Sequence, residues 1–268
     1  MPRQSPDAEA PASVFDLPNA RVLRDEVTLA IEKAILLGAV SPGQRLVEAD
    51  IARQMGISKA PVREALRHLE QLGLVISHPR RGTFVTQLTP TLASEAFSLR
   101  ALLEIYAVRL AISSFDESHF RKMGEINALA DEFFADRRRL VEYDLQFHDV
   151  LFEVSGHSLL QQAWANLRAQ IRLLLTASGI LRAMDRRAGR VLTIAEVHEP
   201  IVSALRAGDY ELAEAAIAAH LAEGERRLLD KLAAGQARPY VRMEIFARRP
   251  DLAPRIGHSE APRSALSD

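Results

Sequence analysis

Four residues in the second half of the chain have the chemical types of a metal site. Asp144 and His148 are four residues apart in a predicted helix, so their side chains project from one face of it. His198 and His220 fall in two later predicted helices, and a helical bundle can bring such side chains together in its core. One carboxylate and three imidazoles suit a divalent ion such as Zn, Ni, Mn or Fe. The spacing leaves a plainer alternative open, in which the histidines are core or capping residues and Asp144 is a surface acid.

A second set of candidates is basic and lies in the first third of the chain. Lys59 and Arg63 are one turn apart near the start of a predicted helix, and Arg67 follows one turn later. A recognition helix presents its first turns to base edges in the major groove, where an arginine can pair with guanine. We therefore predict that Lys59 and Arg63 read bases and that Arg67 touches the DNA backbone. Ser58 is a suitable N-cap for this helix and can also reach a phosphate. Taken alone, Lys59 or Arg63 is more often part of a solvated helix face, and it is their combination with the helix-turn-helix spacing and a basic hairpin that favours DNA binding.

Two short runs of β-forming residues flank the sequence HPRRG at 78–82, which predicts a hairpin with a basic tip. Arg80 and Arg81 suit the minor groove or the flanking phosphates, and Gly82 permits a tight turn that approaches the duplex closely. The alternative is a basic turn without a ligand.

The elements that position these basic residues follow one another closely. Periodicity and turn signals predict helices over 20–37, 47–55 and 58–72, followed by strands over 74–77 and 83–87. The order of helix, helix, tight turn, helix and hairpin predicts a winged helix-turn-helix DNA-binding domain over residues 17–88.

The second half of the chain is almost entirely helical in pattern. Predicted helices cover 91–113, 117–135, 139–155, 158–178, 185–207 and 209–233. The fold class is therefore mainly α, with an all-helical antiparallel bundle of six or seven helices over 91–234. Pro200 must lie in a first helical turn or cause a kink. Residues 1–16 are predicted to be disordered and residues 235–268 to form a flexible C-terminal tail.

Composition excludes several classes of protein. The chain has 268 residues and no cysteine, which excludes disulfides, thiolate metal sites and a cysteine nucleophile. No apolar run is long enough to span a membrane, so we expect no membrane partner and a cytoplasmic location. The net charge is −1, but residues 17–90 carry 10 Lys or Arg against 7 Asp or Glu, whereas residues 91–235 carry 17 against 21. The predicted DNA-binding half is thus the more basic one.

Several motifs of the first half carry a family resemblance. They are Pro42-Gly43, Ile51-Ala52, Met55-Gly56-Ile57-Ser58, Pro61-Val62-Arg63-Glu64-Ala65-Leu66 and Gly82-Thr83-Phe84-Val85. Together they resemble the winged helix-turn-helix of GntR-family bacterial regulators over residues 20–87. The resemblance implies binding to double-stranded DNA, and it departs from the family pattern at Lys59, where arginine is usual.

Motifs of the second half of the chain carry a second family resemblance. They are Asp144-Leu-Gln-Phe147-His148, Leu151-Phe152, Ser155-Gly156, His198, Ile201, Ala204-Leu205, Gly208-Asp209 and Ala219-His220-Leu221. They resemble the FCD ligand-binding domain of the FadR-like GntR subfamily. The resemblance implies that Asp144, His148, His198 and His220 are metal ligands beside a small carboxylic-acid metabolite. His157, where the family commonly has Asn, and Pro200 depart from the pattern.

The same resemblance implies an arginine that holds the effector carboxylate. Arg100 matches a recurrent arginine of the family, with Glu104 one turn later. The alternative is a surface ion pair between these two residues. Arg172 and Arg168 are weaker effector-binding candidates on a later helix.

The prediction is a metabolite-responsive transcription regulator, expected to be a repressor, that binds a pseudo-palindromic operator as a homodimer. The alternatives are a helical metalloenzyme, in which Glu199 is the nearest candidate base, and a pure metal sensor.

Overall fold

The computed structural model describes residues 20–178, 186–187 and 190–234. It divides the chain into two compact units, Met1–Thr86 and Gln87–Asp268. The predicted disordered N-terminus, 1–16, and the predicted tail, 235–268, lie outside the described residues. None of the described helices combines the length and the apolar character that a membrane span requires.

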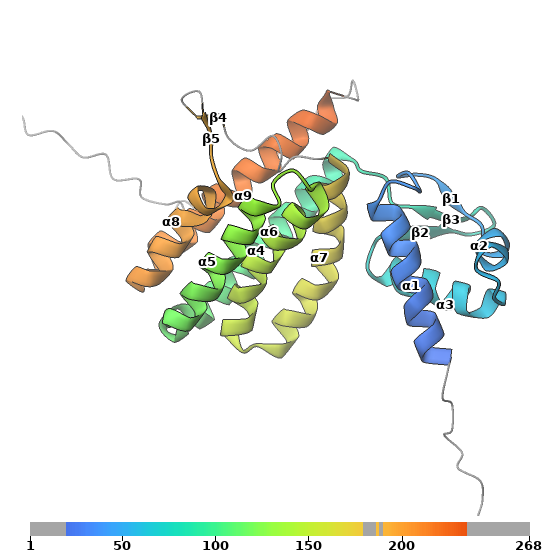
Figure 1. The fold of residues 1–268 in the computed structure, drawn as a ribbon, viewed down its shortest axis with the longest axis horizontal. Coiled ribbons are helices and arrows are strands. Elements are labelled where there is room, and N and C mark those ends of the chain that lie inside the picture. The colour runs from blue at the N-terminus through green and yellow to red at the C-terminus, as the bar shows by residue number, and fades with distance from the viewer. Residues whose placement is uncertain (1–19, 179–185, 188–189, 235–268) are drawn as a thin grey trace, which may run out of the picture. The chain divides into compact units, whose positions relative to one another are not determined.

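The described part of the first unit, residues 20–86, contains three helices and a small antiparallel sheet (Figure 1). Its elements are α1 (Ala20–Leu36), β1 (Arg45–Leu46), α2 (Glu48–Met55), α3 (Lys59–Gln71), β2 (Val75–His78) and β3 (Gly82–Val85). The strand order is β1-β3-β2, and Arg45 of β1 pairs with Phe84 of β3. The predicted winged helix-turn-helix is confirmed. The sequence analysis missed β1, because a strand of two residues carries no periodicity.

The turn between α2 and α3 follows from local sequence. Gly56 ends α2 with a φ of 67°, a left-handed conformation that glycine adopts without steric cost. Ser58 is at the N-cap of α3, as predicted, but its side chain makes no capping hydrogen bond. Val62, Leu66 and Leu69 are buried, and α3 packs against α1. Core packing on this face of α3 leaves the opposite face to solvent.

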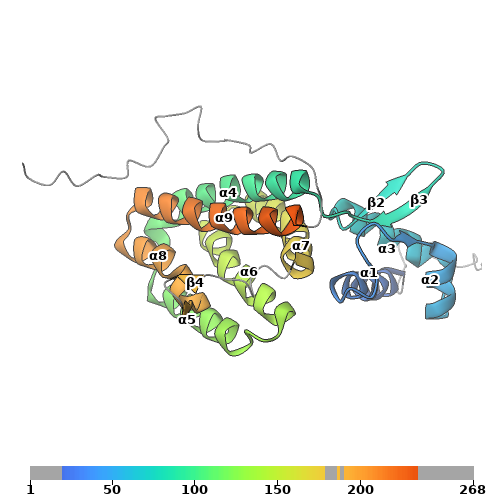
Figure 2. The same cartoon turned by 90° about the horizontal axis from the view of Figure 1, so that it is seen from above.

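The second unit is a helical bundle, which confirms the predicted mainly α class. Its described elements are α4 (Pro90–Ala111), the 3-10 turn η1 (Ile112–Ser114), α5 (Glu117–Glu132), α6 (Arg137–Ser155), α7 (Ser158–Ser178), β4 (Arg186–Arg187), β5 (Arg190–Val191), α8 (Ile194–Ala207) and α9 (Tyr210–Ala233). Helices α4 and α9 run side by side, as Figure 2 shows.

Helix α6 is the central helix of this unit. It contacts α4, α5 and α7, and apolar side chains are buried on most of its circumference. The buried apolar residues of α6 are Leu140, Val141, Leu145, Phe147, Val150, Leu151 and Phe152. Polar residues on this helix, Asp144 and His148 among them, are therefore carried into the bundle interior.

The helix predicted over 185–207 is wrong in its first part. Strands β4 and β5 pair there in antiparallel orientation, and α8 begins only at Ile194. Thr193 and Glu196 form a capping box at this start, and the Asp131 carboxylate accepts a hydrogen bond from the Ile194 N–H at 2.6 Å. Pro200 lies inside α8 rather than in its first turn. It donates no hydrogen bond to the preceding turn, because proline has no N–H.

Candidate metal centre and nucleic-acid interface

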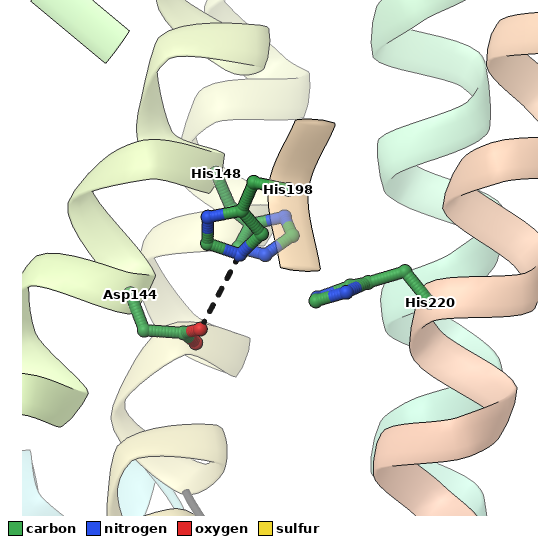
Figure 3. Close-up of side chains that lie close together, drawn as sticks. All are labelled: Asp144, His148, His198 and His220. Atoms are coloured by element: carbon green, nitrogen blue, oxygen red, sulfur yellow. Dashed lines mark ion pairs between the residues drawn. The ribbon is translucent and has the colours of Figure 1, made fainter. Parts of the chain in front are cut away.

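The structure brings together all four predicted metal ligands (Figure 3). Asp144 and His148 come from α6, His198 from α8 and His220 from α9. One ligand atom of each lies within 4.8 Å of the others. Asp144, His148 and His198 are buried. His220 keeps partial exposure, yet its ring lies 5.0 Å from that of His198 and 5.2 Å from that of His148, centroid to centroid.

Three buried polar atoms of this cluster have no hydrogen-bond partner among the described residues. They are Asp144 Oδ1, His148 Nε2 and His198 Nε2. The distance from His198 Nε2 to Asp144 Oδ1, 3.5 Å, is an ion-pair distance but too long for a good hydrogen bond. Buried polar atoms are normally paired, because an unpaired one costs about 1–3 kcal/mol. Three such atoms meeting at one point indicate a site for an added group.

The other ring nitrogens of the two buried histidines are paired. The Nδ1 of His148 lies 2.8 Å from Glu104 Oε2, and the Nδ1 of His198 lies 2.8 Å from Asn127 Oδ1. Phe147 stacks on the His198 ring at 3.8 Å between centroids. These contacts fix both rings with Nε2 facing the cluster. Sequence analysis gave no role to Asn127, which lies on α5 and has no pattern linking it to His198.

Burial and charge set the protonation states of the cluster. Burial raises the pKa of Asp144, but its attraction to His198 and His148 outweighs burial and leaves this pKa below its ordinary value. Burial lowers the pKa of His198, an effect that Asp144 only partly offsets. Burial also lowers the pKa of His220, well below its ordinary value. An ionised carboxylate beside imidazoles whose protonation burial opposes, as at His198 and His220, is a combination that suits a metal ion.

The donor set fits a divalent cation. Ligand atoms at ~2.0–2.2 Å from one ion lie no more than about 4.4 Å apart. The four ligand atoms of the cluster lie within 4.8 Å of one another, which is slightly more than this limit. A small inward movement of the side chains would bring them to coordination distance. The unpaired Asp144 and histidine atoms supply the required lone pairs.

The predicted effector residue Arg100 is buried, with 2% of its surface exposed. Its Nε donates to Glu104 Oε1 at 2.6 Å, so the pair exists, but inside the bundle and not on the surface. Its Nη2 is buried without a hydrogen-bond partner among the described residues. Arg172 is partly buried, 3.5 Å from the Glu142 carboxylate, and Arg168 bridges Glu142 and Asp149. Arg100 is therefore the most deeply buried of the three candidates, and its Nη2 donor has no partner among the described residues.

The predicted recognition helix presents its basic residues to solvent. Ser58, Lys59, Arg63 and Arg67 are exposed. Arg63 pairs with Glu48 of α2 at 3.1 Å, and this contact raises the pKa of Arg63. Arg67 pairs with Glu64 at 2.9 Å. Both pairs are solvent-exposed, so a phosphate or a base can replace the carboxylate at small cost.

The predicted wing tip is also accessible. Arg80 and Arg81 are exposed in the turn between β2 and β3, and Arg80 has a φ of 64°. Gly82 has a φ of 99°, and a Cβ there would lie 3.0 Å from Arg45 Nε. The backbone conformation favours glycine here, whereas the Arg45 guanidinium is the end of a flexible, exposed side chain and can move aside.

Comparison with known proteins identifies both halves of the chain. Residues 23–85 match the family described as "Bacterial regulatory proteins, gntR family", and residues 95–223 match the FCD domain. The "Probable D-xylose utilization operon transcriptional repressor" of Paenarthrobacter nicotinovorans is 32% identical over 213 residues, covering 78% of this chain and 91% of that protein. The gluconate operon transcriptional repressor of Bacillus subtilis (strain 168) is 25% identical over 188 residues, covering 69% of this chain and 76% of that protein.

A solved structure shows the same architecture. The crystal structure described as a GntR transcriptional regulator from Rhodococcus sp. RHA1 has a TM-score of 0.64 and 25% identity, covering 77% of this chain and 97% of that one. These similar proteins are transcription regulators and not enzymes, which removes the metalloenzyme alternative. In keeping with this, Glu199 is exposed and accepts a hydrogen bond from Ser203. The chain belongs to the GntR family of bacterial regulators and is a DNA-binding transcription regulator with an FCD domain.

Proposed function

We propose that this regulator is a repressor whose helical unit binds a divalent metal ion and a small carboxylate effector. The observation that carries the proposal is a set of buried atoms that find no hydrogen-bond partner in the described part of the chain. Asp144 Oδ1, His148 Nε2 and His198 Nε2 meet at one point, and the Nη2 of Arg100 lies in the same bundle. Lone pairs facing inward suit a cation, and an unused guanidinium donor suits an anion.

Asp144, His148, His198 and His220 would hold the metal, with Zn, Ni, Mn or Fe as the candidate ions. A divalent ion there would supply positive charge to an effector carboxylate. Arg100 would donate from Nη2 to the same carboxylate, and Arg172 is a second candidate contact on α7. One relative is named as the repressor of a gluconate operon, and gluconate carries a carboxylate.

In the DNA-binding unit, Lys59 and Arg63 would contact bases in the major groove, and Ser58 and Arg67 the backbone. Arg80, Arg81 and Gly82 would place the wing tip against the minor groove or phosphates. The exposure of these arginines and of Lys59 supports these roles.

Helix α4 supports the proposal of a homodimer. Four large apolar residues form a solvent-exposed stripe along it: Leu99 (46% exposed), Leu102 (53%), Tyr106 (46%) and Leu110 (39%). Such a stripe is unfavourable in water unless a partner covers it. In an antiparallel pair of α4 helices centred on Leu102, the exposed Glu95 of one copy is opposite the exposed Arg109 of the other, because each is seven residues from the centre. The stripe therefore suits a second copy of this chain, which a pseudo-palindromic operator also requires.

Leu102→Glu should dissociate the dimer in sedimentation velocity, because it places two carboxylates at the centre of the interface. Leu129→Glu is the matched control, since Leu129 is 38% exposed on α5, away from the stripe. An unchanged sedimentation coefficient for Leu102→Glu would contradict the proposed interface.

The effector would act by favouring one of two conformations with different operator affinity, since a ligand shifts an equilibrium only through differential binding. We expect loss of operator binding when the effector is bound, and hence derepression.

The test combines a thermal-shift measurement with operator binding. Wild-type protein stripped of metal should gain thermal stability with Zn²⁺, and a panel of small carboxylic acids should weaken operator binding only when metal is present. His220→Ala should lose the response to Zn²⁺, whereas His68→Ala, an exposed histidine of α3, should keep it. Absence of a Zn²⁺ response in wild type would contradict the metal site. A change in operator binding with Zn²⁺ alone would instead favour the pure metal sensor.

A further inference from the structure

Glu104 of α4 lies between two groups that the proposed function uses separately. Its Oε1 accepts a hydrogen bond from Arg100 Nε at 2.6 Å, and its Oε2 lies 2.8 Å from His148 Nδ1. Glu104 and His148 are fully buried, and Arg100 is 2% exposed. A single buried carboxylate therefore joins the candidate effector arginine to a candidate metal ligand.

The chemistry of the carboxylate determines which atoms remain available. An ionised carboxylate can only accept hydrogen bonds, so the Nδ1 of His148 must carry the proton in this contact. In a neutral imidazole the lone pair is then on Nε2, the buried atom that faces Asp144 and His198 and has no hydrogen-bond partner within the described ranges. On the other side, Glu104 occupies the Nε of Arg100 and leaves Nη2 without a partner among the described residues.

We infer that Glu104 is a positioning residue that fixes the tautomer of His148 and the orientation of Arg100 together. This inference rests on the proposed function, because it assigns Glu104 a role toward the metal ion and the effector. Glu104 touches neither directly, and it acts through the two side chains that it holds.

The second buried histidine provides a contrast. His198 is oriented by the neutral amide of Asn127, and no described arginine is bonded to that amide. Losing Asn127 therefore affects metal binding alone, whereas losing Glu104 affects metal binding and carboxylate binding together. Outer contacts of this type typically contribute about 10- to 100-fold to metal affinity.

The first test needs no variant. In metal-free wild-type protein at neutral pH, ¹⁵N NMR of the imidazole nitrogens should show His148 as the Nδ1–H tautomer. Finding the Nε2–H tautomer would overturn the inference.

The second test uses Glu104→Gln, which keeps the size of the side chain but replaces an acceptor oxygen by a donor NH₂. Zn²⁺ affinity, measured by competition with a chromophoric chelator, should fall about 10- to 100-fold. At saturating Zn²⁺, affinity for acetate should also fall, because Arg100 loses its anchor. Glu142→Gln is the matched control, since Glu142 pairs with Arg168 on the same bundle and contacts no imidazole in the described residues; its Zn²⁺ affinity should be unchanged.

The outcomes separate this inference from the proposed function. Equal Zn²⁺ affinity in wild type and Glu104→Gln would overturn the inference and leave the metal site intact. Failure of wild type to bind Zn²⁺ would overturn the proposed function and the inference with it.

Discussion

Replacing Arg63 by alanine should strongly weaken specific operator recognition without unfolding the protein. The Arg63 side chain is 54% exposed, and among the described residues it pairs with the Glu48 carboxylate at 3.1 Å. Removing an exposed ion pair has little effect on stability. The change instead removes a guanidinium that can pair with a guanine edge, a contact that contributes about 5- to 150-fold in discrimination. A dimer uses this contact in both half-sites, so the combined loss is roughly 25-fold or more.

The assay is fluorescence anisotropy at one fixed salt concentration, with an operator selected in vitro by the wild-type protein and a scrambled duplex. Arg63→Ala should lower the ratio of specific to non-specific affinity and leave non-specific affinity nearly unchanged, because a base contact carries the sequence information. Arg53→Ala is the control, since Arg53 is likewise exposed and paired, with Asp50 on α2. An unchanged ratio for Arg63→Ala, with normal thermal unfolding, would refute the recognition-helix assignment.

Three further predictions concern stability. Metal-free protein should lose stability as the pH falls below about 6.5, because burial lowers the pKa values of His198 and His220 and the unfolded state then binds more protons. Each of the two histidines should reduce the free energy of unfolding by up to ~1.4 kcal/mol per pH unit. A free energy of urea unfolding that stays constant from pH 7 to 5 would contradict this. Gly82→Ala should destabilise the first unit by about 1–3 kcal/mol in urea unfolding, since alanine is strained at a φ of 99°; an unchanged midpoint would argue against the wing geometry. Asp131→Ala should lower the free energy of unfolding by about 0.5–2 kcal/mol, because it removes the acceptor for the Ile194 N–H. An unchanged free energy of unfolding would show that this contact does not stabilise the start of α8.

Local sequence signals predicted the DNA-binding unit well. Gly56 and Ser58 define the helix-turn-helix, and the buried Val62, Leu66 and Leu69 have the spacing of one helix face. Each of these signals acts over a few residues, which is the range over which a single sequence is informative. The start of α8 shows the limit. The capping box of Thr193 and Glu196 was present in the sequence, but the predicted helix began at 185 and so included the paired strands β4 and β5.

The candidate ligands could be identified from the sequence, but the residues that surround and orient them could not. Asp144 and His148 share a helix face, whereas the contacts from Glu104 and Asn127 to the histidines join residues that are 44 and 71 positions apart. The burial of Arg100 likewise depends on how α4 packs against α6 and α7, which no local pattern specifies. The sequence thus identifies these residues as candidates, whereas tertiary packing determines their burial and orientation.

The most direct test of the metal centre is anomalous diffraction at the zinc absorption edge, from crystals of full-length protein grown with Zn²⁺. Our account predicts a peak between Asp144, His148, His198 and His220, at ~2.0–2.2 Å from the ligand atoms. A peak elsewhere, or no peak with these side chains turned apart, would contradict it.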